Sequence, residues 1–210
     1  MTKNIVDVCW TMYRSNTTFD FIYFVMKRQK GFNLSFFLLN TFVVKFLLIA
    51  LGRIFKRDYY RYFYIRLLKG YHYDELVKYI DQFYQEFLIS RQIEFTFNLL
   101  DGFVDKADVI LCSASLDIIV EKVANNFGVE YFASHLAFKN NVCLGLLESD
   151  LLFSKHELFS DVEIDCVITD NLSDYNLVKR AKNPIILSNK KNVIFWEERN
   201  IHVNYIFEGE

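Results

Sequence analysis

Residues that break or loosen a folded chain are scarce in this sequence. Among 210 residues there are one proline and seven glycines, and there is no internal repeat or low-complexity tract. Disordered, collagen-like and linker-rich chains are rich in proline or glycine and poor in large apolar side chains, so these classes are excluded. A globular chain of this length buries roughly 70% of its unfolded surface and needs no disulfide or metal in order to fold.

Cysteine is also scarce, and its placement argues against a disulfide framework. None of the four cysteines shows a C-x-x-C spacing, and three of them lie inside apolar runs. Residues 1–10 lack the charged leader and the apolar stretch of about 7–15 residues that mark a secretory signal. We therefore expect reduced, buried thiols in a cytoplasmic protein. The four positions are Cys9, Cys112, Cys143 and Cys166.

The sequence also lacks an excess of charge of one sign. Its 24 Lys and Arg residues nearly balance its 26 Asp and Glu residues, which gives a formal net charge of −2. No global electrostatic field therefore points to nucleic acid, and we expect no nucleic-acid partner.

Large apolar side chains are abundant, and they divide the chain into two zones. Hydrophobic residues make up 52% of the sequence, and 25 of its 37 aromatic residues lie between Trp10 and Phe97. Outside this interval, short β-branched runs alternate with helical patterns, such as Leu116–Phe127 with Gly128 placed for a left-handed C-terminal cap. This alternation predicts a Rossmann-like α/β fold with a central parallel sheet flanked by helices. The predicted strands are Lys3–Cys9, Asp108–Cys112, Ile164–Thr169, Pro184–Leu187 and His202–Ile206.

The aromatic-rich interval has a helical pattern instead. Asp74–Leu88 has the apolar stripe of an amphipathic helix. Phe36–Leu51 is almost wholly apolar, but it has 16 residues, is interrupted by Asn40 and Lys45, and is shorter than the roughly 20 residues needed to cross a bilayer. We interpret this run as a buried helix of an inserted bundle. Contact with a membrane or a greasy ligand is the alternative.

A basic and aromatic segment follows the apolar run. Between Arg53 and Lys69 there are six basic residues and one acid, which gives a local charge of +5, and the five aromatic residues of Tyr59–Tyr64 are interleaved with them. One interpretation is a helix with a packed aromatic side and a solvated basic side. The alternative joins this segment to the apolar run in a peripheral membrane contact. The basic residues are Arg53, Lys56, Arg57, Arg61, Arg66 and Lys69.

Polar side chains suited to phosphoryl chemistry follow several predicted strands, where an open parallel sheet presents its ligand site. Asp7 lies near the end of the first predicted strand, and Ser113 follows the second. Asp170 and Asp174 follow the third, and Lys155 precedes that third strand. An Asp can act as a nucleophile, further Asp oxygens suit Mg²⁺, and a hydroxyl with a lysine binds the non-bridging phosphoryl oxygens. Each residue alone is also typical of a turn or helix cap.

The ordered set of these elements resembles the haloacid dehalogenase (HAD) superfamily, in particular its phosphoserine-phosphatase-like branch with a helical cap between the first two motifs. The resemblance covers nearly the whole chain. It rests on DVCWTMYRSNTTFDF, LLKGYHYDELVKYIDQFYQEFL, VILCSASLDIIVEKVANNFGVEYFAS and TDNLSDYNLVKRAKNPIILSNKKN. It implies a HAD-like core of residues 1–14 and 98–210, with an inserted α-helical cap domain of residues 15–97.

The resemblance also implies catalytic roles. Asp7 would be the nucleophile that forms an aspartyl-phosphate, Ser113 would hydrogen-bond the phosphoryl group, and Lys155 would neutralise charge on both. Lys139 and Lys182 are near Lys155 in the sequence, and the helix-like SKHELF run at Lys155 favours it over them.

Substrate and metal ligands follow from the same resemblance. A small phosphorylated substrate would be bound by Thr11, Ser113, Ala114 and Lys155. A Mg²⁺ cofactor would be held by Asp7, the backbone carbonyl of Cys9, Asp170 and Asp174.

One departure from the family pattern bears on the chemistry. Its phosphatases have a second Asp two residues after the nucleophile, which protonates the leaving group and then activates water; here that catalytic position is Cys9. General acid–base catalysis is worth about 10²–10⁴ in rate, and a free thiol titrates near pH ~8.5, so it is a poor substitute for a carboxylate. A lesser departure is Thr169, where the fourth motif usually has Gly, and this narrows the approach to Asp170.

Three interpretations of the site follow. The first is a Mg²⁺-dependent phosphatase acting on a small phosphate ester. The second is phosphoryl transfer, or hydrolysis of a substrate with an easy leaving group, through Asp7 without the second Asp. The third is a non-catalytic protein that binds a phosphorylated ligand or a partner.

Overall fold

The computed structural model describes residues 2–29, 31–55, 57–103 and 106–207. The strands are β1 (Lys3–Val6), β2 (Val109–Leu116), β3 (Glu130–Lys139), β4 (Val142–Ser149), β5 (Ile164–Thr169), β6 (Asn183–Asn189) and β7 (Val203–Phe207). The α-helices are α1 (Thr17–Arg28), α2 (Leu34–Leu39), α3 (Phe42–Phe55), α4 (Tyr59–Ile65), α5 (Tyr73–Phe83), α6 (Glu94–Asp101), α7 (Asp117–Phe127), α8 (Tyr175–Val178) and α9 (Val193–Glu197).

The strands form a single mostly parallel sheet in the order β4-β3-β2-β1-β5-β6-β7. Every neighbouring pair is parallel except β3 and β4, which form an antiparallel hairpin at one edge. The strand β1 lies at the centre, where the chain order reverses, with Val6 beside Leu111 of β2 and Ile168 of β5. Ligands of open parallel sheets bind at the carboxyl ends of the strands on either side of such a reversal. The predicted α/β fold is confirmed.

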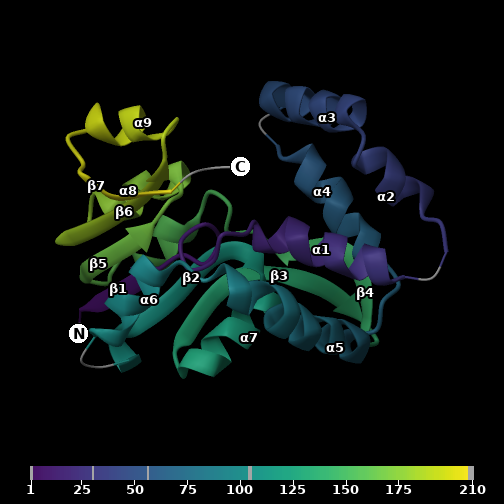
Figure 1. Cartoon of the computed structure of the whole chain (residues 1–210), viewed down its shortest axis with the longest axis horizontal. Coiled ribbons are helices and arrows are strands. Elements are labelled where there is room, and N and C mark those ends of the chain that lie inside the picture. Colours follow the sequence, from purple (N-terminus) through teal and green to yellow (C-terminus); the bar gives the residue numbers. More distant parts are fainter. Residues whose placement is uncertain (1, 30, 56, 104–105, 208–210) are drawn as a thin grey trace.

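Helices cover both faces of this sheet because its inner strands are apolar on both sides. Val6 and Leu111 belong to one buried cluster together with residues of α1, α5 and α7. Ile5 and Ile110, one residue earlier on each strand, belong to a second cluster with residues of α8 and α9. In Figure 1, α2, α3 and α4 project away from the sheet, with α3 at the outer end of the projection.

The predicted helices form, with two differences. The helix α7 ends at Gly128, whose backbone is left-handed at φ +67°, as predicted. The predicted helix over Asp74–Leu88 is α5 followed by a π-helical turn. The apolar run is two helices instead of one, because the chain turns at Asn40 between α2 and α3. Its interpretation as a buried helix is wrong, since α3 contains no buried residue.

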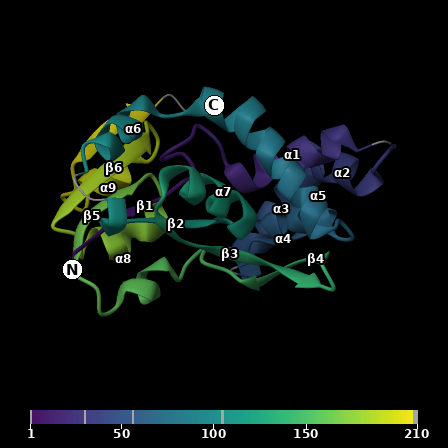
Figure 2. The ribbon, with the colours of Figure 1, turned by 90° about the horizontal axis from the view of Figure 1, so that it is seen from below.

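The β3–β4 hairpin was not predicted from the sequence. It joins the sheet to the helical insertion, which consists of the helices α1–α6 between β1 and β2 (Figure 2). The amide of Gly70 donates to the carbonyl of Cys143 at 2.9 Å, and the amide of Cys143 donates to the carbonyl of Tyr71 at 2.8 Å. Gly145 sits close behind this contact, because a Cβ there would lie 2.9 Å from Cβ of Lys69 and 3.0 Å from the carbonyl oxygen of Arg66. The turn before α5 is therefore held against β4 by backbone hydrogen bonds and by close packing.

We predict that Gly145→Ala destabilises the protein more than Gly128→Ala does. Both glycines are left-handed, at φ +66° and φ +67°, so both substitutions carry the backbone penalty of about 1–2 kcal/mol. Only at Gly145 would the new methyl group also meet neighbouring atoms, whereas at Gly128 nothing lies within 4 Å. Urea unfolding of the two variants measures the difference. Equal losses would show that the hairpin is not tightly packed on the insertion.

Candidate active site

Asp7 lies immediately after β1, at the carboxyl end of the central strand. Its side chain is 4% exposed. Its backbone amide donates to the carbonyl of Ile168 at 2.9 Å, which extends the β1–β5 pairing by one residue. Its Oδ1 accepts a 2.7 Å hydrogen bond from the amide of Val8. The carboxylate is therefore held by the backbone on one side and has its second oxygen, Oδ2, left to face the neighbouring elements.

Lys155 fills the space beside Asp7. It begins the 3₁₀ turn Lys155–Phe159 and is 3% exposed. Its Nζ lies 2.8 Å from Oδ2 of Asp7 and 2.8 Å from Oδ2 of Asp174. Burial alone would lower the pKa of this lysine, but Asp174 and Asp7 outweigh that effect and raise the pKa above its ordinary value. Lys155 is therefore a charged ammonium that joins the ends of β1 and β5.

The two other lysines considered lie elsewhere. Lys139 is exposed at the end of β3. Lys182 is exposed and pairs with Glu163. Among the described residues, neither of these two lysines forms an ion pair with Asp7.

Asp174 is fixed by a second contact as well as by Lys155. The hydroxyl of Thr169 donates to its Oδ2 at 2.7 Å, and the same hydroxyl accepts from the amide of Asn171 at 3.0 Å. Thr169, which stands where the fourth motif of the superfamily that the sequence resembles usually has Gly, therefore positions the carboxylate of Asp174. Asp174 is 4% exposed, and Oδ2, the oxygen that Lys155 contacts, is the one that Thr169 also holds.

Asp170 and Thr11 form a second pair at this edge of the sheet. The hydroxyl of Thr11 lies 3.2 Å from Oδ1 of Asp170, and the amide of Asp170 donates to the same hydroxyl oxygen at 3.0 Å. Burial, followed by the negative charge of Asp7, raises the pKa of Asp170 well above its ordinary value, against the opposing effect of Lys155. Asp170 is thus a carboxylate whose charge is not fully compensated.

Cys9 points into a cluster of hydroxyl groups at the start of α1. Its Sγ is 3.0 Å from Oγ1 of Thr17, which in turn is 2.6 Å from Oγ of Ser115. Burial and the charge of Asp7 raise the pKa of the thiol to about 11. Cys9 is therefore a neutral thiol at physiological pH, and it lies two residues after Asp7 in the sequence.

Ser113 and Ala114 lie within the carboxyl half of β2, because the strand continues past the predicted end at Cys112 to Leu116. The hydroxyl oxygen of Ser113 accepts a hydrogen bond from the amide of Ser115 at 3.3 Å. The carbonyl oxygen of Ala114 accepts from Arg61 at 2.6 Å and from Ser134 at 3.0 Å. Among the described residues, no hydrogen bond joins Ser113 or Ala114 to the carboxylates of the site.

Arg61 is a residue that the sequence analysis missed. It was grouped with the solvated basic residues, but it is 6% exposed and connects α4 to the core. Its Nη1 lies 2.7 Å from both carboxylate oxygens of Asp150, while its Nη2 donates to Ala114. The signal is in the spacing, because Arg61 begins a buried stripe that continues with Tyr64, Ile65 and Leu68.

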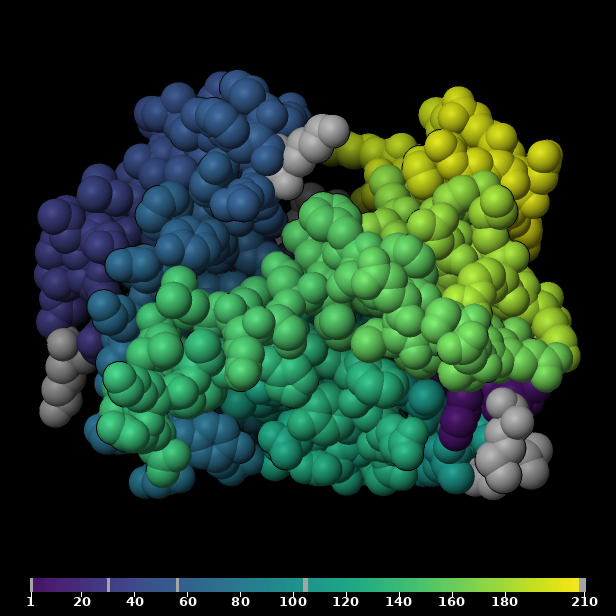
Figure 3. Space-filling model, turned by 180° about the vertical axis from the view of Figure 1, so that it is seen from behind, coloured from purple at the N-terminus to yellow at the C-terminus, as the bar shows by residue number. Residues whose placement is uncertain are grey.

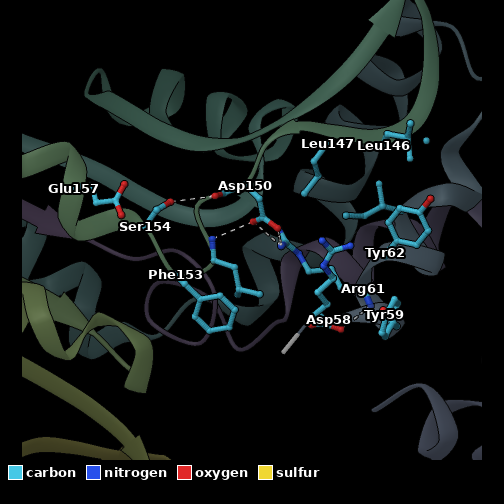
Figure 4. Close-up of a pocket in the computed structure, with 14 residues that line it drawn as sticks. Asp58, Tyr59, Arg61, Tyr62, Leu146, Leu147, Asp150, Phe153, Ser154 and Glu157 are labelled. Atoms are coloured by element: carbon cyan, nitrogen blue, oxygen red, sulfur yellow. Dashed lines mark hydrogen bonds and ion pairs between the residues drawn. The ribbon is translucent and has the colours of Figure 1, made fainter. Parts of the chain in front are cut away.

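A cavity of about 820 Å³ is lined in part by Arg61 and Asp150 (Figure 4). Its walls come from α4, from β4 and from residues of the segment 150–157, including Ser154 and Glu157, which lie close to Lys155 in the sequence. Figure 4 shows Arg61 and Asp150 pointing toward one another in the middle of this wall, with Phe153 and Tyr62 beside them. No predicted site residue lines it, so the cavity is next to the candidate active site and separate from its carboxylates.

The geometry defines an acidic site at the carboxyl ends of β1 and β5 with one buried ammonium. Within the described part of the chain, no group of three or more His, Cys, Asp or Glu side chains is arranged to hold a metal ion. No protein-family model matches the sequence, and no curated protein matches it significantly.

The fold is that of HAD-superfamily phosphatases, including the phosphoserine-phosphatase-like branch, as the sequence resemblance predicts. A substrate-bound phosphoserine phosphatase matches with a TM-score of 0.61 and 16% identity over 99% of this chain and 93% of that one. Cytosolic 5'-nucleotidase IIIB bound to cytidine matches with a TM-score of 0.62 and 13% identity, covering 99% and 80%. A protein of unknown function from Bordetella pertussis Tohama I matches at a TM-score of 0.73 and 12% identity over the whole of both chains.

We predict that Lys155→Met destabilises the protein by about 3–5 kcal/mol, because it removes the only ammonium contacting two buried carboxylates among the described residues. Lys182→Met is the matched control, since it removes a lysine from an exposed ion pair. It should leave the free energy of unfolding nearly unchanged. Chemical unfolding at neutral pH measures both values. A loss at Lys155 no larger than that at Lys182 would mean that the carboxylates are not buried in solution.

Proposed function

We propose that the protein is a Mg²⁺-dependent HAD-type phosphatase that acts on a small phosphorylated substrate, with Asp7 as its nucleophile. The observation that supports this most directly is the contact of Asp7 with Lys155 at the carboxyl end of the central strand, in the fold of known phosphatases. Residues 15–97 would act as the cap over the core of residues 1–14 and 98–210. Free cysteines fit a reducing cytoplasmic environment.

The reaction we propose has two steps. In the first, a carboxylate oxygen of Asp7 bonds to phosphorus while the bond from phosphorus to the leaving oxygen breaks, which gives an aspartyl-phosphate. In the second, the oxygen of a water molecule bonds to phosphorus while the bond from phosphorus to the Asp7 oxygen breaks. This step releases inorganic phosphate, passes a water proton to the phosphate or to solvent, and restores the carboxylate. Lys155 would neutralise charge on Asp7 and on the phosphoryl oxygens, and Ser113 and Thr11 would donate hydrogen bonds to these oxygens.

The charges of the site fit a Mg²⁺ ion. Mg²⁺ keeps several of its waters and binds proteins through one or two carboxylates. Asp7 and Asp170 would supply these, with the backbone carbonyl of Cys9, and the raised pKa of Asp170 supports a cation beside Asp7. Asp174 already contacts Lys155 and Thr169, so it would act by orienting a bound water. Bound Mg²⁺ would supply positive charge against the oxygens of the transferring phosphoryl group.

Cys9 decides which substrates suit this site. A thiol with a pKa of about 11 stays protonated at neutral pH, so it cannot take a proton from the attacking water, and it is a much weaker acid toward a leaving oxygen than a carboxylic acid is. Turnover would therefore be fastest for phosphates whose leaving group needs no proton, such as aryl phosphates. The same observation favours a second candidate function, in which the protein binds a phosphorylated ligand without hydrolysing it.

Replacing Asp7 and Cys9 separately tests the mechanism. We expect Asp7→Asn to lower turnover of an aryl phosphate by at least about 10³-fold, because the nucleophile is lost. We expect Cys9→Asp to raise turnover of an alkyl phosphate by about 10²–10⁴-fold, because an acid–base group is restored. Steady-state phosphate release with Mg²⁺ measures both effects, and the exposed Asp101→Asn is the control.

Three outcomes separate the interpretations. Native activity that is insensitive to Asp7→Asn would refute Asp7 as the nucleophile. Turnover that appears only in Cys9→Asp would support the binding function. Native turnover of aryl phosphates with no gain in Cys9→Asp would show that Cys9 does not limit the reaction.

The metal proposal predicts a change in the pH dependence of stability. The folded-state pKa of Asp170 is raised. As pH rises above about 4, the Asp170 carboxyl therefore stays protonated to a higher pH in the native state than in the unfolded state. Without divalent cations this residue therefore makes stability fall as pH rises toward 7. We expect Asp170→Asn to remove that fall and to be more stable than the native protein at pH 7.

Addition of Mg²⁺ should reverse this order. At about a hundred-fold excess over its Kd, the ion would stabilise the native protein by about 2.7 kcal/mol, and the Asp170→Asn variant should not respond. Thermal unfolding with and without Mg²⁺ measures this directly, with the exposed Asp161→Asn as the control. Equal responses to Mg²⁺ in Asp170→Asn and in the control would contradict the proposed metal site.

A further inference from the structure

A large apolar surface on α2 and α3 lies exposed at the outer end of the helical projection. We call it the α2–α3 surface. It includes Phe32, Phe37, Phe42, Val43, Phe46 and Ile54, of which Phe42 is 81% exposed and Ile54 72% exposed. Soluble monomers rarely expose a contiguous apolar patch of this kind, and such patches mark sites of contact with a protein or a membrane. Figure 3 shows this part of the chain, in blue, projecting at the upper left of that face of the molecule, across from the yellow C-terminal part.

The orientation of α3 follows from its side chains. Val44 and Leu48, one turn apart, are the α3 residues that pack against the core. Phe42 and Phe46, also one turn apart, stack on each other with ring centroids 6.2 Å apart on a more exposed side of the helix. The helix α3 is therefore attached along one narrow stripe and presents most of its circumference outward.

The segment of the chain that carries this surface is strongly basic. Residues 21–57 contain no Asp or Glu and seven Lys or Arg, for a charge of +7, while the rest of the chain then carries −2 − 7 = −9. Lys45 and Arg53 lie on α3 itself and are exposed, and Lys27 is exposed at the end of α1. Lys30 and Lys56 also belong to this segment, and both lie outside the described residues. The exposed Lys27, Lys45 and Arg53 make this apolar surface complementary to a negatively charged apolar phase.

We propose that the α2–α3 surface binds peripherally to a lipid bilayer that contains anionic headgroups. No helix in the described ranges is long and apolar enough to span a membrane, and α3, at 14 residues, would be about 21 Å long. It would lie in the interface with its apolar side among the acyl chains and its basic residues at the headgroups. A second copy of this chain would fit poorly, because each copy would bring the exposed Lys45 and Arg53 of its own α3 to the contact.

Flotation of the full chain with lipid vesicles tests this proposal, independently of phosphatase activity. We expect co-migration with vesicles of 70% phosphatidylcholine and 30% phosphatidylglycerol at low salt. Binding should be much weaker to pure phosphatidylcholine vesicles, and it should fall as salt screens the charges. Each basic residue near an anionic surface changes the partition coefficient about five-fold.

Two double variants separate the apolar from the electrostatic contribution. Phe42→Gln with Phe46→Gln should lower the partition coefficient about ten-fold or more, because exposed aromatic side chains no longer enter the bilayer. Lys45→Glu with Arg53→Glu should lower it about 30-fold or more on anionic vesicles. The matched controls are Ile194→Gln and Lys191→Glu, which change an exposed apolar and an exposed basic residue near α9. Both controls should bind as the native protein does.

All of these positions are exposed, so circular dichroism should show folded variants. Absence of co-migration with anionic vesicles at low salt would overturn the proposal. So would equal binding by the α3 variants and their controls. A concentration-dependent dimer that Phe42→Gln with Phe46→Gln abolishes, together with no vesicle binding, would assign the surface to a second copy instead.

Discussion

A single buried ammonium connects the elements on which the candidate site depends. Lys155 contacts carboxylates that follow β1 and β5, so it joins the central strand to its neighbour through charge as well as through the sheet. Three carboxylates and one ammonium nevertheless leave two negative charges in excess. Asp174 is held by Lys155 and Thr169, while burial, followed by the negative charge of Asp7, raises the pKa of Asp170. A divalent cation beside Asp7 and Asp170 would bring this set to neutrality, which is the physical basis of the metal proposal.

The same electrostatics explain why Cys9 is compatible with the fold. A second carboxylate at this position would add a further negative charge beside Asp7. The thiol is neutral, its pKa raised to about 11, and it lies against Thr17 in a cluster of hydroxyl groups. Because this cluster joins α1 to Ser115 of β2, Cys9 contributes to the junction of the insertion with the core. The substitution thus favours the structure of the site, while it removes a group that acid–base chemistry would use.

The sequence predicted those parts of the molecule that depend on local pattern. The strands around Asp7, Ser113 and Asp170 were found from short β-branched runs, because strands buried on both faces leave a recognisable apolar signature. The hairpin of β3 and β4 was missed, since its half-buried residues alternate less clearly. Arg61 was misread because composition gives the charge of a segment but not the partner of each residue. The ion pair of Arg61 with Asp150 joins positions 89 residues apart, and such contacts are fixed only by the tertiary fold.

The exposure of α3 also could not be predicted from local sequence pattern. An apolar helix is normally buried, because covering each large side chain contributes roughly 1.5–3 kcal/mol, so the sequence favours a core position. In the structure, α3 packs against the core only through Val44 and Leu48, and most of its surface is left uncovered. The helix α4 follows α3 along the chain and carries Arg61, which donates to the carbonyl of Ala114 within β2. The helix that adjoins the exposed α3 is therefore also the helix that contacts the second motif of the candidate site.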